Sequence, residues 1–306
     1  MKRELARSKI IAVVGQTAVG KSSVAVALAR RFNGEVISAD SRQVYKGLDI
    51  GTGKITTKEM GDIPHHLLDV ANPKRRFSVA EYQKLAQEKI TDILSRGKVP
   101  IIVGGTGLYV DAVLTDVQFP EVPPHEKLRR KLQKKTPAEL FSMLTKLDPR
   151  RALHIDRYNP RRLIRAIEIA KALGSVPPVR YGISPKFESL SVGLTLSPNV
   201  LKKRIEKRLL ARIASGMIAE ARKLHSRGLS WKQMESLGLE YRYLSRFLRR
   251  LITKKDMIRI LNREIWHYAK RQLTWFKRNK EIVWFEPTKQ SKIQKIIKKV
   301  ETFLRR

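Results

Sequence analysis

The stretch of sequence that decides the fold is Gly15-Gln16-Thr17-Ala18-Val19-Gly20-Lys21-Ser22. Its spacing is that of a phosphate-binding loop, G-x-x-x-x-G-K-[ST]. Residues 9–14 before it are apolar and predict a buried strand, and residues 23–32 after it predict a helix. This arrangement directs backbone N–H groups and the positive end of a helix dipole at phosphate oxygens. A glycine turn that only joins strand to helix would not need Lys21 and Ser22, so we expect a phosphate site.

Positive charge dominates the composition. The 306 residues carry 64 Lys and Arg against 28 Asp and Glu, a formal net charge of +36, and the pI is about 10.7. Such a balance favours a polyanionic partner, with nucleic acid as the first candidate and an anionic membrane surface as the second. A basic proteome or a need for solubility would give the same charge without such a partner. Basic residues occur throughout and become denser after residue 125.

The chain has no cysteine. Disulfides, a thiolate nucleophile and a cysteine-bound zinc are therefore excluded, and the absence fits a reducing cytoplasm. Residues 1–8 lead directly into the first predicted strand, which leaves no room for a signal peptide before it. No stretch approaches the ~20 apolar residues of a membrane span. We therefore expect a cytoplasmic protein with no membrane partner.

Strands and helices alternate in the first third of the chain. Residues 35–40 predict a second strand that ends at Asp40, and residues 99–103 predict another, which Gly104 follows. This alternation predicts a parallel sheet covered by helices on both faces. Ligands bind beyond the carboxyl ends of such strands, so the loops at Gly15, Asp40 and Gly104 should line one cleft.

Two helices have clear start signals. Residues 77–96 predict a helix with Ser78 as N-cap and Glu81 three residues later, which is a capping box. Residues 198–226 predict one long helix with Ser197 as N-cap and a proline at its first position. The other elements expected late in the chain are a strand at 191–196, a helix at 257–278, a strand at 282–285 and a helix at 292–304.

The composition changes after residue 116. Residues 117–178 predict helices rich in Lys and Arg, with an apolar face made by Leu128, Leu132, Leu140, Leu144 and Leu147. We therefore expect a helical insertion at 117–178 in a catalytic core formed by residues 1–116 and 179–306. The expected fold class is α/β, a P-loop-type three-layer core with a parallel sheet, plus the helical insertion domain.

The phosphate loop alone leaves the reaction open. An NTPase or kinase needs a carboxylate for Mg²⁺ at the end of a strand and a group that orients the nucleophile. No apolar stretch ends in an Asp-Glu pair, and the best-placed carboxylate is Asp40. Lys21, an arginine and Mg²⁺ would stabilise a departing diphosphate as well as a phosphoryl group in transfer. Phosphoryl transfer and loss of diphosphate both remain open from these residues.

Five further segments resemble the tRNA dimethylallyltransferase family, also called the IPP transferase family. The most specific is the eighteen-residue block ISADSRQVYKGLDIGTGK at residues 37–54. The others follow in family order at residues 64–69 (PHHLLD), 104–109 (GGTGLY), 159–168 (NPRRLIRAIE) and 268–278 (YAKRQLTWFKR). With the phosphate loop, the resemblance runs from residue 10 to about residue 286.

This resemblance implies an activity, a fold and partners. The activity is transfer of the dimethylallyl group of dimethylallyl diphosphate to N6 of the adenine at tRNA position 37, giving N6-isopentenyladenosine and diphosphate. The fold is a P-loop-type α/β core with a helical insertion. Mg²⁺ is the implied cofactor, the tRNA anticodon stem-loop is the implied partner, and we expect a monomer.

Roles for single residues also follow from the resemblance. Asp40 is the implied base that accepts a proton from the adenine amino group, Thr17 and Arg208 are the other implied catalytic residues, and Ser22 holds the metal. The diphosphate is implied to lie against Gly15, Gln16, Thr17, Ala18, Val19, Gly20, Lys21, Ser22 and Arg208. The residues implied to contact tRNA are Asp40, Ser41, Arg42, Gln43, Thr106, Arg161, Arg162, Leu163, Ile164 and Arg165.

The residues themselves support part of this assignment. Arg161, Arg162 and Arg165 form a basic patch at helical spacing that suits phosphates. A bidentate guanidinium at Arg208 suits diphosphate oxygens, although without the resemblance a solvated charge would explain this arginine equally. The target adenine must leave its stack to reach a cleft.

The chain departs from the family pattern at several places. Gln16 stands where the loop commonly has proline, Val19 where it has a small residue, and Ser22 where it has threonine. Gly53 stands where alanine is usual, and residues 238–241 (GLEY) replace the commoner Gly-Tyr-Lys-Glu. None of the three changes in the loop removes a group that the chemistry requires.

A histidine pair could suggest a metal site. His65 and His66 lie close to Asp69, but adjacent histidines on a regular element cannot easily share one metal. We expect these three residues to be structural.

Three other functions remain as alternatives. A P-loop kinase for a nucleoside or small metabolite could use Asp40 as its base, but residues 37–54 and the charge argue against it. An adenylate isopentenyltransferase would prenylate free AMP or ATP, and the basic insertion favours the polymer instead. An RNA-binding protein without catalysis would not need to keep Asp40, Lys21 and Ser22.

Overall fold

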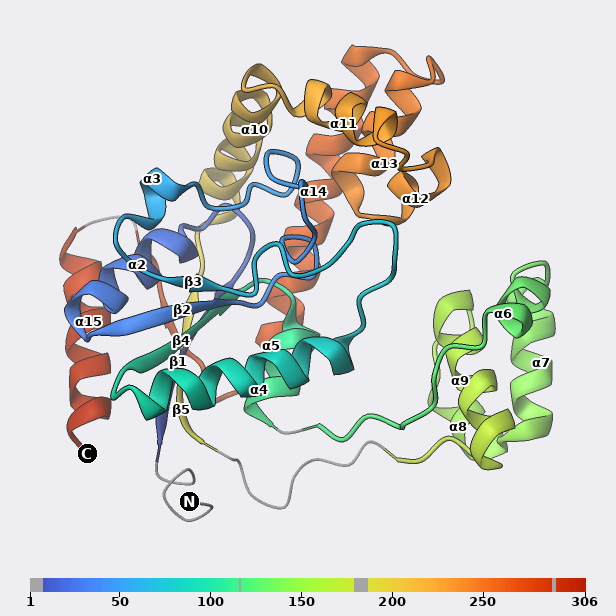
Figure 1. The fold of residues 1–306 in the computed structure, drawn as a ribbon, viewed down its shortest axis with the longest axis horizontal. Helices are drawn as coiled ribbons and strands as arrows, with labels where there is room; N and C mark the ends of the chain where they lie inside the picture. The colour runs from blue at the N-terminus through green and yellow to red at the C-terminus, as the bar shows by residue number, and fades with distance from the viewer. Residues whose placement is uncertain (1–7, 116, 179–186, 288–289) are drawn as a thin grey trace. The chain divides into compact units, whose positions relative to one another are not determined.

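The computed structural model describes residues 8–115, 117–178, 187–287 and 290–306. It divides into two compact units, one formed by Met1–Asp116 with Ser184–Arg306 and the other by Val117–Ile183 (Figure 1). The N-terminal segment before residue 8, and residues 116 and 179 at the two expected domain junctions, lie outside the described residues.

Six parallel strands form one sheet in the larger unit, in the order β3-β2-β4-β1-β5-β6. Their bounds are β1 Lys9–Gly15, β2 Gly34–Ser38, β3 His65–His66, β4 Val99–Gly104, β5 Glu188–Leu194 and β6 Val283–Phe285. The central strand β1 pairs Val13 with Val103 of β4 and with Val192 of β5. Residues 10–14 of β1 have no exposed surface, as expected of a parallel strand covered on both faces. The predicted α/β class with a parallel sheet is confirmed.

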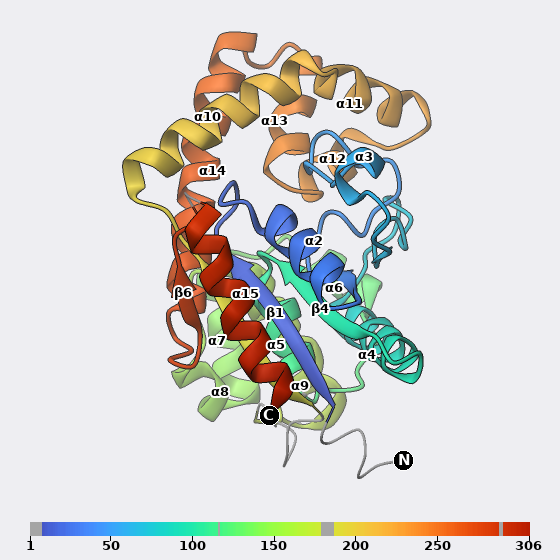
Figure 2. The ribbon, with the colours of Figure 1, turned by 90° about the vertical axis from the view of Figure 1, so that its left-hand side faces the viewer.

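Helices cover both faces of this sheet. The helices that pack on it are α2 Lys21–Arg31, α4 Val79–Ser95, α5 Gly107–Leu114, α14 Lys254–Phe276 and α15 Gln290–Arg305. The helix α2 lies on one face of the sheet and α4, α5 and α14 lie on the other (Figure 2), which is the arrangement that right-handed crossovers produce. The helix α15 returns to the face of α2, which is turned to the viewer in Figure 2. Among the described helices, none is long and apolar enough to cross a membrane.

The start of α4 is as predicted. The Ser78 hydroxyl accepts a hydrogen bond from the Glu81 backbone N–H (3.1 Å), and the Glu81 carboxylate accepts one from the Ser78 N–H (2.8 Å). The expected strand at 191–196 begins earlier, at Glu188, and ends at Leu194. The late helices and the last strand lie within three residues of their expected bounds.

The expected single helix over residues 198–226 is wrong. The chain forms α10 Pro198–Ala214 and α11 Met217–Ser226, separated at Gly216, whose φ of 100° ends one helix and starts the next. Only glycine adopts this conformation without strain. Ser197 occupies the N-cap position of α10, but its side chain makes no capping hydrogen bond. Four further helices were not predicted: α3 Thr57–Met60, α5 Gly107–Leu114, α12 Trp231–Ser236 and α13 Leu239–Leu248.

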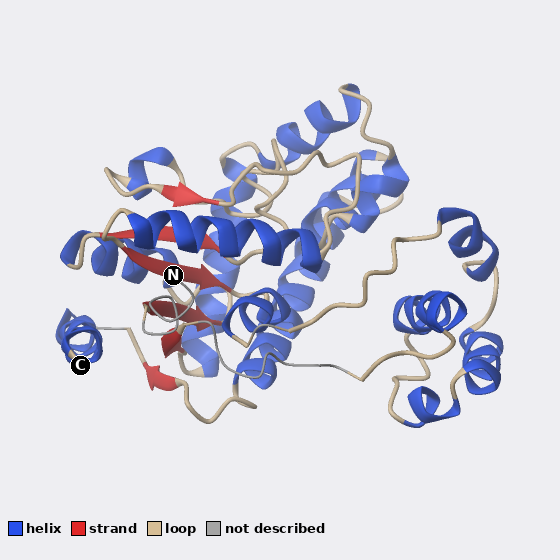
Figure 3. Ribbon diagram, turned by 60° about the horizontal axis from the view of Figure 1, so that its bottom comes forward, coloured by secondary structure: helices blue, strands red, loops and turns tan. Residues whose placement is uncertain are grey.

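The described part of the smaller unit, residues 117–178, contains four helices (Figure 3). They are α6 Glu126–Leu132, α7 Pro137–Leu147, α8 Pro149–Leu153 and α9 Pro160–Leu173. Leu132, Leu140 and Leu144 are buried in a core of this unit's own residues, and Leu128 and Leu147 pack at its margin. The apolar face expected from the leucine spacing is therefore the face that forms this core.

Candidate active site around the phosphate-binding loop

The loops after β1, β2 and β4 line one cavity of about 510 Å³. Lys21 comes from the first loop, Asp40 from the second, and Gly104 and Gly105 from the third. This is the convergence expected of parallel strands, whose carboxyl ends meet at one edge of the sheet. Close packing joins the last two loops, because a Cβ at Gly104 would lie 2.1 Å from the carbonyl oxygen of Ala39.

The phosphate loop takes its shape from its own residues. Gly20 (φ 96°) and Ala18 (φ 62°) have left-handed backbone conformations, and α2 begins directly afterwards at Lys21. Val19 has no exposed surface and fixes the loop to the hydrophobic core. Thr17, Ala18, Gly20, Lys21 and Ser22 line the cavity, whereas Gly15, Gln16 and Val19 are not among its lining residues.

Lys21 is the central cation of the loop. Its Nζ donates a hydrogen bond to the carbonyl oxygen of Gln16 (2.7 Å). Burial lowers the pKa of Lys21 to about 7, against the attraction of Asp40, which raises it, while the positive charge of Arg208 lowers it further. An anion bound in the cavity would restore the charge of this lysine, because opposite charge favours the protonated form.

The long helix α14 binds the phosphate loop through hydrogen bonds to Gln16 and Thr17. The Gln272 side chain accepts a hydrogen bond from the Thr17 backbone N–H (2.8 Å) and donates one to the Gly105 carbonyl oxygen (2.9 Å). Gln16 is buried and donates from Nε2 to the carbonyl oxygen of Ala269 (3.3 Å). Gln16 therefore binds helix α14 through its side chain, and the Thr17 N–H is already occupied.

Asp40 follows β2 and is oriented by its own chain. Its Oδ1 accepts hydrogen bonds from the backbone N–H groups of Arg42 (2.8 Å) and Gln43 (3.3 Å). Aspartate commonly closes a turn in this way. The carboxylate is thereby held at the cavity wall, on the side of residues 40–43.

Tyr268 lines this side of the cavity, and Thr106 supports it from behind the lining residues. The Thr106 hydroxyl accepts a hydrogen bond from the Ser41 N–H (3.1 Å), so the third loop holds the second. Burial raises the pKa of Tyr268, and the nearby negative charge of Asp40 raises it further. Tyr268 therefore remains a neutral hydroxyl beside Asp40.

Arg208 reaches the cavity from α10. Its Nη2 donates a hydrogen bond to the carbonyl oxygen of Gly53 (2.9 Å). The side chain keeps solvent-exposed surface, yet the protein atoms around it and the charge of Arg212 lower its pKa. Arg204 and Lys207 line the cavity beside it, so four cations including Lys21 surround this space.

Comparison with known proteins identifies the family. The family model described as IPP transferase matches residues 43–279, which is more than half of the chain. The chain belongs to the IPP transferase family. The resemblance read from the sequence is thereby confirmed, together with the transferase class that it implied.

Relatives of this IPP transferase cover nearly its whole length. It is 41% identical over 284 residues to the tRNA dimethylallyltransferase of Anoxybacillus flavithermus, covering 92% of this chain and 91% of that protein. It is 40% identical to the solved tRNA isopentenylpyrophosphate transferase of Bacillus halodurans, with a TM-score of 0.73 and 97% and 96% of the two chains covered. A eukaryotic dimethylallyltransferase acting on tRNA gives a TM-score of 0.80 at 27% identity, over 97% of this chain and 79% of that one.

The basic run of this IPP transferase lies on α9 of the smaller unit. Asn159 caps the helix by accepting a hydrogen bond from the Arg162 N–H (3.2 Å). The side chains of Arg161 and Arg162 are exposed and that of Arg165 is partly buried. The other two residues of this run, Leu163 and Ile164, were also expected to contact tRNA. They pack in the hydrophobic core of this unit instead.

The histidine pair has structural contacts. His66 Nε2 lies 2.7 Å from the buried carboxylate of Glu35, and His65 Nδ1 lies 2.8 Å from the carbonyl oxygen of Ile63. Asp69 forms an ion pair with Lys54 (2.6 Å). Within the described residues, no group of three or more His, Cys, Asp or Glu could hold a metal ion. These contacts agree with the structural role expected for the pair.

Several residues of the site region were not identified from the sequence, among them Arg204 and Lys207, which line the cavity, and the four residues that follow. Gln272 and Tyr268 lie in a segment that carried the resemblance, but their side chains had no assigned role. Glu220 and Tyr241 contact residues 49–51 from helices α11 and α13. The α14 segment at residues 268–278 pointed toward Tyr268 and Gln272, and the departure from the family pattern at residues 238–241 pointed toward Tyr241.

Proposed function

We propose that this IPP transferase transfers the dimethylallyl group of dimethylallyl diphosphate to N6 of adenine 37 in tRNA. The products are N6-isopentenyladenosine in the tRNA and diphosphate. One observation carries the proposal: the phosphate loop and Asp40 line the same cavity, so a diphosphate and an acceptor base can meet there. The names of the relatives, tRNA dimethylallyltransferases, agree with this reaction.

The diphosphate side stabilises the leaving group. The bond from the allylic carbon to the diphosphate oxygen breaks, its electron pair leaves with the oxygen, and one further unit of negative charge develops on the departing diphosphate. The N-terminus of α2, the Lys21 ammonium and the Arg208 guanidinium face this space. Preorganised cations and N–H groups of this kind lower the barrier because they need no rearrangement during the reaction. Thr17 contributes its hydroxyl at the same wall of the cavity.

Mg²⁺ fits the same side as a cofactor. Magnesium commonly binds one or two protein oxygens together with substrate phosphates and water. Ser22 supplies a hydroxyl at the first turn of α2, and it lines the cavity beside Lys21. The ion would neutralise part of the charge that develops on the diphosphate.

The adenine side supplies the base. An adenine amino group is a weak nucleophile, and a carboxylate that accepts its proton during attack assists it. A bond forms between N6 and the allylic carbon, and one N6 proton moves to Asp40. Since Asp40 Oδ1 already accepts two backbone N–H groups, the carboxylate needs no reorientation before the proton arrives.

The tRNA is bound by charge and by residues near Asp40. The adenine leaves its stack and enters the cavity, and the nucleotide contacts Ser41, Arg42, Gln43 and Thr106, of which Gln43 lines the cavity. The exposed arginines of α9 bind the flanking phosphates, and the net charge of +36 adds affinity that depends on salt and little on sequence. We place the enzyme in the cytoplasm as a monomer, together with its tRNA.

One experiment tests the proposal. The protein is incubated with Mg²⁺, labelled dimethylallyl diphosphate and either unmodified tRNA or AMP. We expect label in tRNA at adenine 37 and none in AMP. Label in AMP alone would identify an adenylate isopentenyltransferase instead. Phosphoryl transfer from ATP without prenyl transfer would identify a kinase, and either result would refute the proposal.

A further inference from the structure

One carbonyl group connects the two halves of the proposed active site. The carbonyl oxygen of Gly53 accepts a hydrogen bond from Arg208 Nη2 (2.9 Å) and a second from Gln43 Nε2 (3.3 Å). Under the proposed function, Arg208 binds the diphosphate and Gln43 contacts the tRNA nucleotide. The position of this single carbonyl therefore affects the side chains that bind both substrates.

Gly53 lies in a short turn rather than in a helix or strand. Its N–H donates to the carbonyl oxygen of Ile50 (3.0 Å), and the next N–H, of Lys54, donates to that of Asp49 (2.9 Å). The turn that contains Gly53 is thus closed on residues 49 and 50. Whatever holds Asp49 and Ile50 also holds Gly53.

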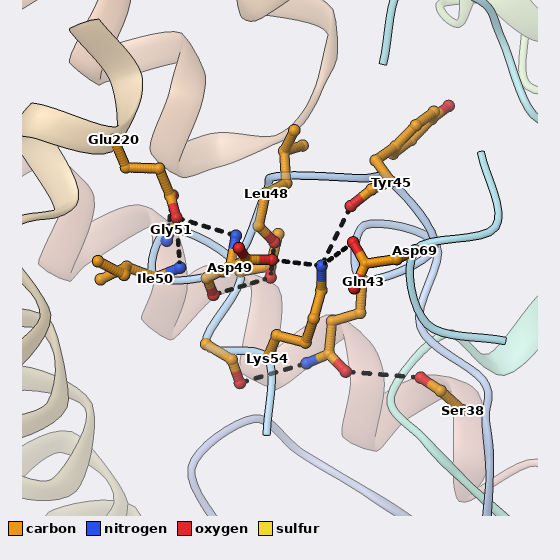
Figure 4. Close-up of polar contacts among 12 residues, drawn as sticks. Ser38, Gln43, Tyr45, Leu48, Asp49, Ile50, Gly51, Lys54, Asp69 and Glu220 are labelled. Atoms are coloured by element: carbon orange, nitrogen blue, oxygen red, sulfur yellow. Dashed lines mark hydrogen bonds and ion pairs between the residues drawn. The ribbon is translucent and has the colours of Figure 1, made fainter. Parts of the chain in front are cut away.

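Glu220 of α11, which is distant in sequence, binds the backbone of residues 49–51 (Figure 4). Its Oε2 accepts the N–H groups of Asp49 (3.0 Å) and Ile50 (2.7 Å), and its Oε1 accepts that of Gly51 (2.9 Å). Successive N–H groups in a turn form a concave anion site. Here the anion is a side chain of the same protein, 170 residues away in sequence.

Tyr241 and Arg212 stabilise the contact between Glu220 and residues 49–51. The Tyr241 hydroxyl donates a hydrogen bond to Glu220 Oε1 (2.6 Å), and a Cβ at Gly51 would lie 2.6 Å from the Tyr241 ring. Arg212 Nη1 donates to the carbonyl oxygen of Gly51 (2.7 Å). The Glu220 carboxylate therefore accepts four hydrogen bonds, and a bidentate charged acceptor of this kind is among the strongest in proteins.

We propose that Glu220 is a positioning residue for the transfer reaction: it fixes residues 49–51 so that the Gly53 carbonyl places Arg208 and Gln43 together. Glu220 touches neither substrate and acts only through this turn. The proposal rests on the proposed function, because it uses the roles given there to Arg208 and Gln43.

The test is the Glu220→Gln variant. The amide keeps the size of the carboxylate, but it offers one acceptor oxygen and turns an NH₂ group toward backbone donors. We expect hydrogen exchange of the amides of residues 49–51 to accelerate at least ten-fold. We also expect KM to rise about ten-fold for dimethylallyl diphosphate and for tRNA together, because one carbonyl serves both binding side chains.

Glu81→Gln is the matched control. Glu81 also accepts a backbone N–H, at the capping box of α4, and forms an exposed ion pair with Arg75. This variant loses a comparable contact in the same unit, so both KM values should stay within two-fold of wild type. Tyr241→Phe removes one hydrogen bond from Glu220 and leaves its three backbone contacts. It should raise both KM values about two-fold, and it gives a second measurement if Glu220→Gln does not fold.

The results separate this inference from the function on which it rests. Faster exchange at residues 49–51 with both KM values unchanged would leave Glu220 a purely structural residue and overturn the proposal. A rise in both KM values without faster exchange would also overturn it. Failure of the wild-type protein to prenylate tRNA would contradict the proposed function itself, and it is seen before any variant is made.

Discussion

The two sides of the cavity are held in different ways. The diphosphate side is built on a continuous stretch, residues 15–22, whose glycines, buried Val19 and following helix give the loop its shape, and Gln272 of α14 then supports it. The adenine side, residues 40–53, has little regular structure and depends on distant residues: Thr106, Arg208, Arg212 and Glu220. The first side can therefore be recognised from local sequence, whereas the shape of the second depends on contacts that form only in the folded protein.

The strongest test of this contrast removes the proposed base alone. Asp40→Asn keeps the oxygen that accepts the N–H groups of Arg42 and Gln43, so the turn should survive. We expect kcat to fall about 10³-fold, within the range for loss of a general base, and the Kd for tRNA to stay within two-fold. Single-turnover rates and tRNA binding measure the two quantities. Near-normal turnover would remove Asp40 from the role of base.

The matching test on the diphosphate side removes its central cation. Lys21→Ala should lower kcat/KM for dimethylallyl diphosphate about 10²-fold, because a preorganised charge on the leaving group is lost. Binding of tRNA should not change. Lys89→Ala, an exposed lysine on α4, serves as the control. A weaker tRNA complex in the Lys21 variant would mean that the two sides are not independent.

The pH dependence of the wild type follows from the same lysine. Burial lowers the pKa of Lys21 to about 7, so the free enzyme loses this charge as the pH rises through 7. We expect kcat/KM for dimethylallyl diphosphate to fall about ten-fold between pH 6.5 and 8.5. Lys21→Arg, which stays charged throughout, should flatten this part of the profile. An unchanged slope in that variant would assign the titration to another group.

The lowered pKa of Lys21 also makes the free energy of unfolding depend on pH. The dependence has the opposite sign to that of a lysine whose pKa is raised by a salt bridge. Between about 7 and the ordinary lysine value, the unfolded chain binds a proton at Lys21 that the folded chain does not. The contribution of Lys21 to the free energy of unfolding therefore rises with pH in this window. Urea unfolding of wild type and Lys21→Met at pH 7 and pH 9 measures it, and the pH-dependent difference should vanish in the variant.

A smaller effect is expected at Gly53, which lies beside Arg208. A Cβ there would lie 2.4 Å from Arg208 Nη2, and the φ of 60° is unfavourable for alanine. Gly53→Ala should raise KM for dimethylallyl diphosphate about five-fold and cost about 1 kcal/mol of stability. Gly97→Ala has nearly the same φ of 66° but no atom within 4 Å of the new Cβ. It should lose the same stability with an unchanged KM.

The smallest effect lies outside both sides of the cavity. Arg162 of α9 is exposed, and Arg162→Ala should weaken tRNA binding about three-fold and reduce the slope of log Kd against log salt by about one. KM for dimethylallyl diphosphate should not change. A constant salt slope would show that this arginine does not contact a phosphate.

The same contrast explains what the sequence could predict. Residues 9–22, the α4 capping box at Ser78 and the position of Asp40 at the end of β2 all depend on neighbours within a few residues. The break at Gly216 was missed because the apolar stripe of the predicted helix continues from Leu201 through Met217, so the pattern carries no sign of a turn. Glu220 was missed because its partners are 170 residues away and are backbone groups, which no side-chain pattern reveals.

The helical unit at residues 117–183 has a consequence of another kind. It buries Leu140, Leu144 and Ile167 against its own residues, so it can gain or lose a turn of helix without opening the core beneath the phosphate loop. Under the proposed function, the residues of this unit could then vary with the tRNA that they bind, whereas the residues of the cavity are constrained by the diphosphate that leaves there.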